Sequence, residues 1–151
     1  MPNWCYNRIT IYGDEKTEAK LKEIEEIFEK ADPFNQIFPI PDFKNIPNEK
    51  GELPKLEQRL NPDGSVFYET YIFPDGTNDD RWYHWCVENW GTMWDACDKS
   101  IDYEDSEILA LTFNTAWSPP EGVVDKLRKK YPELSFQCFY DEPGCEIAGY
   151  Y

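Results

Sequence analysis

Apolar and polar positions along the first thirty residues predict a strand followed by a helix. Residues 3–12 are rich in β-branched and aromatic side chains that alternate between two faces, which is typical of a strand. From residue 17 to residue 30 the period becomes helical, with Leu21, Ile24, Ile27 and Phe28 on one stripe. Asp14 or Thr17 is expected to cap this helix, and Asp32-Pro33 is expected to end it.

The segment around residues 80–96 is the densest in tryptophan, with four of the six tryptophans of the chain. Its helical spacing predicts a helix over residues 80–90 that starts at Asp79 or Asp80 and ends at Gly91. We expect a strand to begin at Met93. The packed face of the helix would carry these residues: Trp82, Trp85, Cys86, Asn89 and Trp90.

The remaining C-terminal segments predict three strands and one helix. Residues 93–101 and 107–117 read as a hairpin around an acidic turn, and the second of these strands is apolar on both faces, as a central strand would be. Ser118-Pro119-Pro120-Glu121 has the composition of a capped helix start. The buried stripe of that helix is expected to consist of Val123, Val124, Leu127 and Tyr131. Residues 134–140 and 146–151 then predict two further strands, separated by Glu142-Pro143-Gly144.

This order of elements predicts an α+β fold, a ferredoxin-like split βαβ sandwich with an antiparallel sheet and helices on one face. We expect a single domain over residues 1–151, interrupted at about residues 34–79 by a proline-rich insertion that leads into the Trp-rich helix. Residues 65–73 are the best strand candidate within that insertion. A connection of this length is unusual in a compact domain, which indicates either a functional insertion or a segment that wraps over the core.

The charge of the chain limits its partners, because the formal net charge is −15. Direct binding to nucleic acid or to an anionic membrane surface is disfavoured, since both require a basic surface. A basic protein partner remains open, as does mimicry of DNA, although solubility alone explains such a charge. Neither a secretory signal nor a membrane span is recognisable, and the five cysteines show no Cys-x-x-Cys pair, so a cytoplasmic location is expected.

Four segments of the chain resemble one protein family. They are Met-Pro-Asn-Trp-Cys-x-Asn-Arg at residues 1–8, residues 88–96, Thr-Ala-Trp-Ser-Pro-Pro at residues 115–120, and residues 140–151. The pattern is similar to that of the YubB-like ferredoxin-like proteins of plasmids and phages. The resemblance covers residues 1–30 and 80–151 and leaves the insertion unmatched. It implies the ferredoxin-like fold and a mobile-element origin, but no activity.

The polar residues within the Trp-rich segments have two readings. In the structural reading, Asn89 and Asp95 tie the corner between helix and strand to neighbouring backbone groups, because a buried polar group without a partner is costly. In the functional reading, tryptophans wall a pocket whose polar groups include Arg8. The candidate ligand-binding residues are Arg8, Trp85, Asn89, Trp90, Trp94, Asp95 and Trp117.

The sequence predicts no catalytic residue, no set of metal ligands and no cofactor. His84, Cys86 and Glu88 alternate at i, i+2 and i+4. Residues two apart point in different directions on a helix, so these three do not converge on one metal ion. Residues 75–79 lack the glycine and the glutamate of a calcium loop. If Met1 were removed, Pro2 would become an N-terminal secondary amine, but no catalytic partner for it can be named.

Two functions from different classes therefore remain. The first is a non-enzymatic acidic binding module of mobile-element type that engages or inhibits a host protein through its acidic surface or its insertion. The second is a small-molecule or nucleotide-binding protein, with or without an enzymatic activity, that uses the Trp-lined pocket. The sequence does not determine the oligomeric state.

Overall fold

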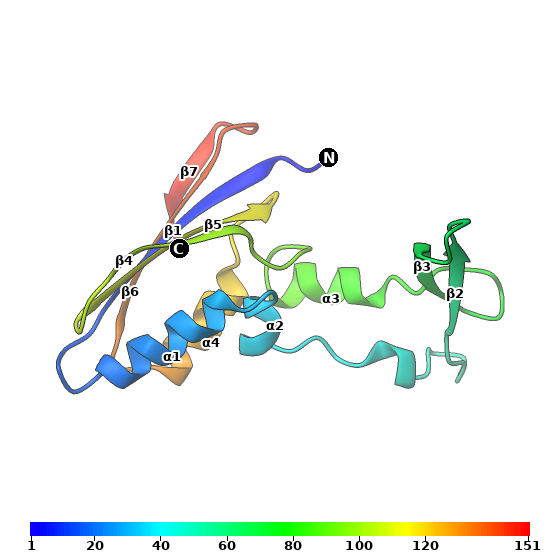
Figure 1. Cartoon of the computed structure of the whole chain (residues 1–151), viewed down its shortest axis with the longest axis horizontal. Coiled ribbons are helices and arrows are strands. Elements are labelled where there is room, and N and C mark those ends of the chain that lie inside the picture. Colours follow the sequence, from blue (N-terminus) through cyan, green and yellow to red (C-terminus); the bar gives the residue numbers. More distant parts are fainter. The chain divides into compact units, whose positions relative to one another are not determined.

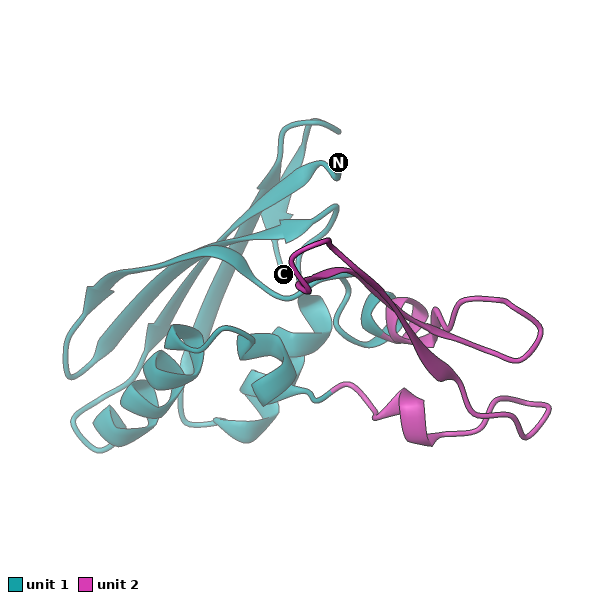
Figure 2. Ribbon diagram, turned by 45° about the vertical axis from the view of Figure 1, so that its right-hand side comes forward, with its two compact units in different colours: residues 1–39, 86–151 teal, residues 40–85 magenta.

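The computed structural model describes all 151 residues and divides them into two compact units. Residues 1–39 and 86–151 form the first unit, which we call the sheet unit, and residues 40–85 form the second, the hairpin unit (Figure 2). The boundary lies between Trp85 and Cys86, within helix α3 (Arg81–Asn89).

A five-stranded antiparallel sheet forms the centre of the sheet unit, in the order β4-β5-β1-β6-β7. Its strands are β1 (Trp4–Tyr12), β4 (Cys97–Glu104), β5 (Ile108–Ala116), β6 (Ser135–Glu142) and β7 (Ile147–Tyr150). Strand β1 lies in the middle, where Ile9 is opposite Leu111 of β5 and Cys138 of β6. With one helical crossover after β1 and another after β5, this is the predicted ferredoxin-like α+β fold.

Helices cover one face of this sheet (Figure 1). They are α1 (Glu18–Glu29), the short α2 (Pro33–Ile37) and α4 (Glu121–Lys130). The apolar stripe of α4 is buried as predicted, and that of α1 is buried except at the half-buried Ile27. Ring contacts join the layers: Phe28 and Phe34 each lie 5.6 Å from Phe113 of β5, between ring centroids. No helix of the chain combines the length and the apolar character that crossing a bilayer requires.

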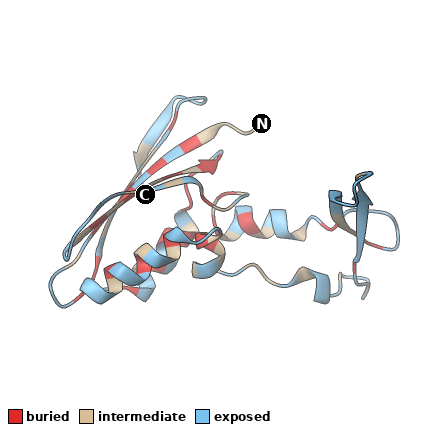
Figure 3. Ribbon diagram, in the orientation of Figure 1, coloured by how far each residue is buried: buried red, intermediate tan, exposed pale blue.

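The opposite face of the sheet has no helix over it (Figure 1). Leu109, Leu111 and Phe113 of β5 are buried, but Ala110 and Thr112 between them are only half-buried (Figure 3). The expected burial of a strand that is apolar on both faces is therefore found on one face only. The second row, Ile108, Ala110, Thr112 and Asn114, is half-buried and has no helix over it. We call this surface the open face.

The corner after the Trp-rich helix differs from the prediction. Gly91 adopts φ +90° and ends the helix as expected, since a left-handed residue there favours glycine. Residues 93–96, however, are not a strand, and β4 begins only at Cys97. The predicted packed face is also incomplete: Cys86 and Trp90 are buried and Trp85 and Asn89 half-buried, whereas Trp82 is 41% exposed.

The start of helix α4 also differs from the expected capping box. The helix begins at Glu121, and the hydroxyl of Ser118 donates to the carbonyl oxygen of Gly91 instead of capping the helix. Gly122 permits the close approach of the two segments, because a Cβ atom there would lie 1.7 Å from the carbonyl oxygen of Asn89. Its own N–H donates to the carbonyl oxygen of Trp90 at 3.1 Å.

The hairpin unit contains a short 3₁₀ helix, η1 (Phe43–Asn45), and a two-stranded antiparallel sheet. Strand β3 (Val66–Ile72) confirms the strand expected at residues 65–73, and β2 (Lys55–Leu60) pairs with it unpredicted. All six residues of β2 are exposed. The register of the two strands shifts between Arg59 and Leu60, whose partners in β3 are Tyr68 and Val66, so Phe67 of β3 has no partner in β2.

Candidate functional site

The structure places the predicted tryptophans in different surroundings. Trp90 is buried, packs edge-on against Phe34, and donates its indole N–H to the carbonyl oxygen of Phe38 at 2.8 Å. Trp94 packs on Trp4, with 6.4 Å between ring centroids. Trp117 is 51% exposed and has a left-handed backbone at φ 71°. Trp85 belongs to the hairpin unit. Ligand binding by these residues remains a prediction.

Asp95 stabilises the start of helix α2. Its carboxylate accepts hydrogen bonds from the backbone N–H groups of Phe34 and Asn35 at 3.0 Å each, and from that of Ala96 at 2.8 Å. It therefore caps the first turn of α2 from a distant part of the chain, where the orphan N–H groups of a helix need acceptors. Burial raises the pKa of this carboxyl, and the three hydrogen bonds oppose that shift.

The segments that carry the family resemblance contact one another at one end of the sheet. The Trp117 N–H donates to the carbonyl oxygen of Asn3 at 2.9 Å, and the Thr92 hydroxyl donates to that of Ala116 at 2.8 Å. At the C-terminal end, the Tyr151 hydroxyl donates to the side-chain oxygen of the buried Asn7 at 2.9 Å. These residues secure the sheet, so the resemblance is explained by the fold.

The open face holds a groove of about 410 Å³, which is within the size range of small-ligand sites. Arg8 lies in it, and its guanidinium carbon sits 5.5 Å from the centroid of the Phe139 ring, a cation–π arrangement. Of the seven predicted site residues, Arg8 alone lines this groove. The lining residues are Tyr6, Asn7, Arg8, Asp98, Thr112, Phe113, Asn114, Phe139 and Asp141.

Strand register brings the groove residues together. Tyr6 is directly opposite Asp141, and Arg8 is opposite Phe139 on the same strand pair, so alternate residues of β1 and β6 present the four side chains on the open face. On the other side, β4 is irregular between Cys97 and Ser100, and Asp98 has φ 47°. Such irregularities redirect side chains.

Two carboxylates, one guanidinium and two aromatic rings define the chemistry of the groove. Asp98 accepts a hydrogen bond from the Asn114 amide at 3.1 Å and is exposed, as is Asp141. Tyr6 is 50% exposed, and Tyr150 of β7, 71% exposed, packs against Phe139 with 5.2 Å between centroids. The groove can therefore hold charged and planar groups.

Neither a metal site nor a reactive thiol accompanies the groove. No group of three His, Cys, Asp or Glu side chains is arranged to hold a metal ion. Burial raises the pKa of the Cys5, Cys86 and Cys138 thiols to about 11 each, which keeps these groups protonated and unreactive near neutral pH.

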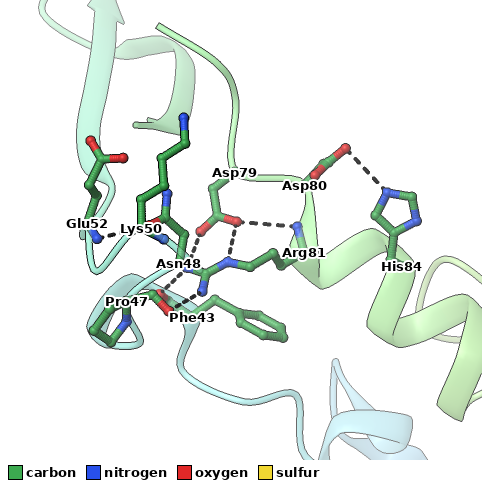
Figure 4. A network of polar contacts seen from close by, with 9 residues as sticks. All are labelled: Phe43, Pro47, Asn48, Lys50, Glu52, Asp79, Asp80, Arg81 and His84. Atoms are coloured by element: carbon green, nitrogen blue, oxygen red, sulfur yellow. Dashed lines mark hydrogen bonds and ion pairs between the residues drawn. The ribbon is translucent and has the colours of Figure 1, made fainter. Parts of the chain in front are cut away.

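A polar network around Arg81 organises the hairpin unit (Figure 4). The guanidinium makes two hydrogen bonds to the carboxylate of the buried Asp79, at 2.8 and 2.9 Å, and others to the carbonyl oxygens of Phe43 and Pro47, at 2.8 and 3.3 Å. It also lies over the rings of Phe43 and Phe73. The bonded guanidinium holds the pKa of Asp79 below its usual value. With its donors engaged in this way, Arg81 stabilises the unit.

Sequence reasoning missed most of the groove. Asp98, Phe139 and Asp141 were not among the candidates, although the alternation of residues 3–12 already assigned Tyr6 and Arg8 to one face. The missing information was the register of β1 against β6 and the irregularity at Asp98, because both determine which distant side chains share a surface. Exposed aromatic residues on strands of an open sheet were the available signal.

Comparison with known proteins supports the fold and is silent on activity. Residues 89–151 match a family model described as the ferredoxin-like domain in Api92-like protein. No curated protein matches the chain. Among solved structures, the crystal structure of protein api92 from Yersinia pseudotuberculosis matches with a TM-score of 0.52 at 11% sequence identity, over 99% of this chain and 93% of that one. Residues 89–151 thus resemble the ferredoxin-like domain of Api92-like proteins, and the chain has the ferredoxin-like α+β fold.

Proposed function

We propose that the protein is a non-enzymatic binding module that engages a basic segment of another protein through the open face. The observation that carries this proposal is the groove on that face, where Asp98 and Asp141 flank the exposed ring of Tyr6 and the half-buried ring of Phe139. Exposed aromatic residues are enriched where proteins bind one another. Lysine and arginine side chains suit such a surface, because their charge meets carboxylates and their stems lie on aromatic rings.

The charge of the whole chain acts in the same direction. A net charge of −15 attracts a basic partner over a distance and accelerates encounter, while it repels nucleic acid and anionic lipid. The resemblance to plasmid and phage proteins suggests that the partner is a host protein. Arg8 is held on Phe139 and defines one wall of the groove.

The test is capture of a partner from host lysate by the wild-type chain, followed by affinity measurement with paired variants. Replacement of both groove carboxylates, Asp98→Asn with Asp141→Asn, is expected to weaken binding roughly tenfold, and binding is expected to fall with salt. The matched control, Glu26→Gln with Asp125→Asn, removes two charges from helices α1 and α4 on the covered side. Equal loss with both pairs would show that only net charge matters and would refute the groove as the binding surface.

The groove also supports a second candidate function, the binding of a nucleotide or another small anion with a planar ring. Arg8 stacked on Phe139 is the observation that favours it, since a guanidinium and an aromatic ring can hold a phosphate and a base. Calorimetric titration with a nucleotide panel separates the two functions. Neutralising Asp98 and Asp141 should strengthen the binding of an anion but weaken the binding of a basic peptide. Arg8→Gln should abolish the binding of the anion.

A further inference from the structure

Strand β2 has an unpaired edge that is available to another strand. It pairs with β3 on one side only, and all six of its residues are exposed. In an antiparallel pair, every second residue directs its backbone N–H and C=O groups away from the partner strand. Such an edge is a template for pairing with another chain.

We propose that β2 pairs antiparallel with β2 of a second copy of this chain, with the two-fold axis at Gln58. Each Glu57 then lies opposite Arg59 of the second copy, and each Leu56 lies opposite Leu60 of the second copy. The two hairpins become one four-stranded sheet. This inference concerns the hairpin unit and is independent of the function proposed for the open face.

Hydrogen-bond geometry leaves few alternatives to this register. Because outward-pointing residues must face one another, a strand that pairs with its own copy must place some residue opposite itself. Centring on Glu57 would place two glutamates in contact and Lys55 against Arg59. Centring on Arg59 would place two guanidinium groups in contact. Opposite charges directly across strands stabilise a sheet and like charges destabilise it. Centring on Leu56 would also pair opposite charges, Lys55 with Glu57, but it would align only residues 55–57 of the two strands. Gln58 is therefore the favoured centre.

The apolar side chains of the hairpin support the same register. Within one copy, Leu60 is opposite Val66 and Leu56 is opposite Tyr71. Pairing centred on Gln58 extends these contacts into a row across four strands, from Val66 and Leu60 to Leu56 and Tyr71 of the second copy. Leu56, Leu60 and Val66 are 47%, 61% and 51% exposed in the single chain. In such a row, the exposed apolar side chains contact apolar side chains of the second copy. Two further strands also stabilise a hairpin that is marginal when it has only two.

Charge-swap variants test the pairing by sedimentation velocity over a range of concentrations. The wild type is expected to dimerise, and Glu57→Arg or Arg59→Glu alone is expected to weaken the dimer about tenfold to a hundredfold, because two like-charge contacts replace two ion pairs. The double variant Glu57→Arg with Arg59→Glu restores opposite charges across the axis and should recover dimerisation. All positions are exposed, and circular dichroism confirms that each variant is folded.

Cross-linking locates the two-fold axis. In a Cys145→Ser background, which removes the exposed native thiol, Gln58→Cys should form an intermolecular disulfide readily, because directly opposite residues are close enough to bridge. The matched control is Glu69→Cys, the cross-strand neighbour of Gln58, which lies three strand spacings, roughly 14 Å, from its copy in the proposed sheet. A monomer at every concentration, failure of the double swap, or equal cross-linking at both positions would overturn the proposal.

Discussion

The sheet unit and the hairpin unit are stabilised by different interactions. In the sheet unit, helices α1, α2 and α4 bury Phe28, Phe34 and Leu127 with the inner rows of β1 and β5. In the hairpin unit, the buried residues are Pro54, Phe73 and Asp79. The Arg81 guanidinium contacts the Asp79 carboxylate, the carbonyl oxygen of Phe43 and the ring of Phe73.

The two units differ in how many of their apolar strand residues are buried. The helix-covered face of the large sheet buries its apolar residues, among them Leu109, Leu111 and Phe113, whereas β2 of the hairpin is exposed along its whole length. The hairpin unit therefore relies on one buried ion pair and presents Leu60, Val66 and Phe67 to its surroundings. Surfaces of this kind mark interaction sites.

The largest expected effect is in the core of the sheet unit. Phe113→Ala removes the ring that Phe28 and Phe34 both contact, and we expect a loss of about 3–5 kcal/mol in the free energy of unfolding. Urea denaturation measures it. Phe67→Ala in the hairpin, where the ring is 73% exposed, should change stability by less than about 0.5 kcal/mol. Similar losses for the two variants would abolish the contrast between the units.

Breaking the ion pair should loosen the hairpin unit alone. Arg81→Ala leaves the Asp79 carboxylate buried without its partner, a change that costs roughly 3 kcal/mol locally. Amide exchange in β2 and β3 should accelerate while β1 and β5 keep their protection. Because the pKa of Asp79 is depressed in the folded chain, the pair stabilises the unit above the ordinary aspartate pKa, and the effect is lost as the pH falls below it. The double variant Asp79→Ala with Arg81→Ala should be less damaging than Arg81→Ala.

A smaller effect is expected at the corner of the sheet unit. Asp95→Ala removes the acceptor of three backbone N–H groups, and we expect a loss of about 2–3 kcal/mol, measured by urea denaturation. Asp98→Ala is the matched control, since that exposed carboxylate accepts one side-chain hydrogen bond. If both variants lost the same stability, Asp95 would not be the cap of α2.

The smallest effect is a pH dependence from single buried thiols. The pKa of Cys138 is raised by burial from 9.0 to about 11 in the folded chain. Since the unfolded thiol ionises first, stability is intact below pH 9 and falls as the pH rises toward 11, by about 2 kcal/mol for this residue. The free energy of unfolding of Cys138→Ala should decline less steeply than that of the wild type over this pH range, as measured by denaturant titrations at fixed pH. Parallel declines would show that the thiol does not contribute.

Much of the sheet unit was predictable from sequence because its patterns are periodic. The stripes of α1 and α4 and the alternation in β1 follow directly from which side chains must be buried. Strand β2 escaped notice because Lys-Leu-Glu-Gln-Arg-Leu is exposed throughout and lacks the β-branched residues that mark strands.

The errors have local physical causes. Residues 93–96 looked like a strand, but the carboxylate of Asp95 is recruited to the first turn of α2, sixty positions away in the chain. Ser118 has the composition of a helix cap, but α4 begins only at Glu121, with Pro120 at the cap position, and the Ser118 hydroxyl donates to the carbonyl oxygen of Gly91. The groove was only partly predictable, because Arg8 lies on the open face by alternation, whereas Phe139 and Asp141 reach it through strand register.

Amide hydrogen exchange of the chain at low concentration tests the contrast between the units most directly. We predict that amides of β1 and β5 exchange only by global unfolding, whereas amides of β2 and β3 exchange through local opening with a much smaller free energy. Equal protection in the two sheets, falling together with denaturant, would show that the hairpin unit shares the stability of the core and would contradict this account.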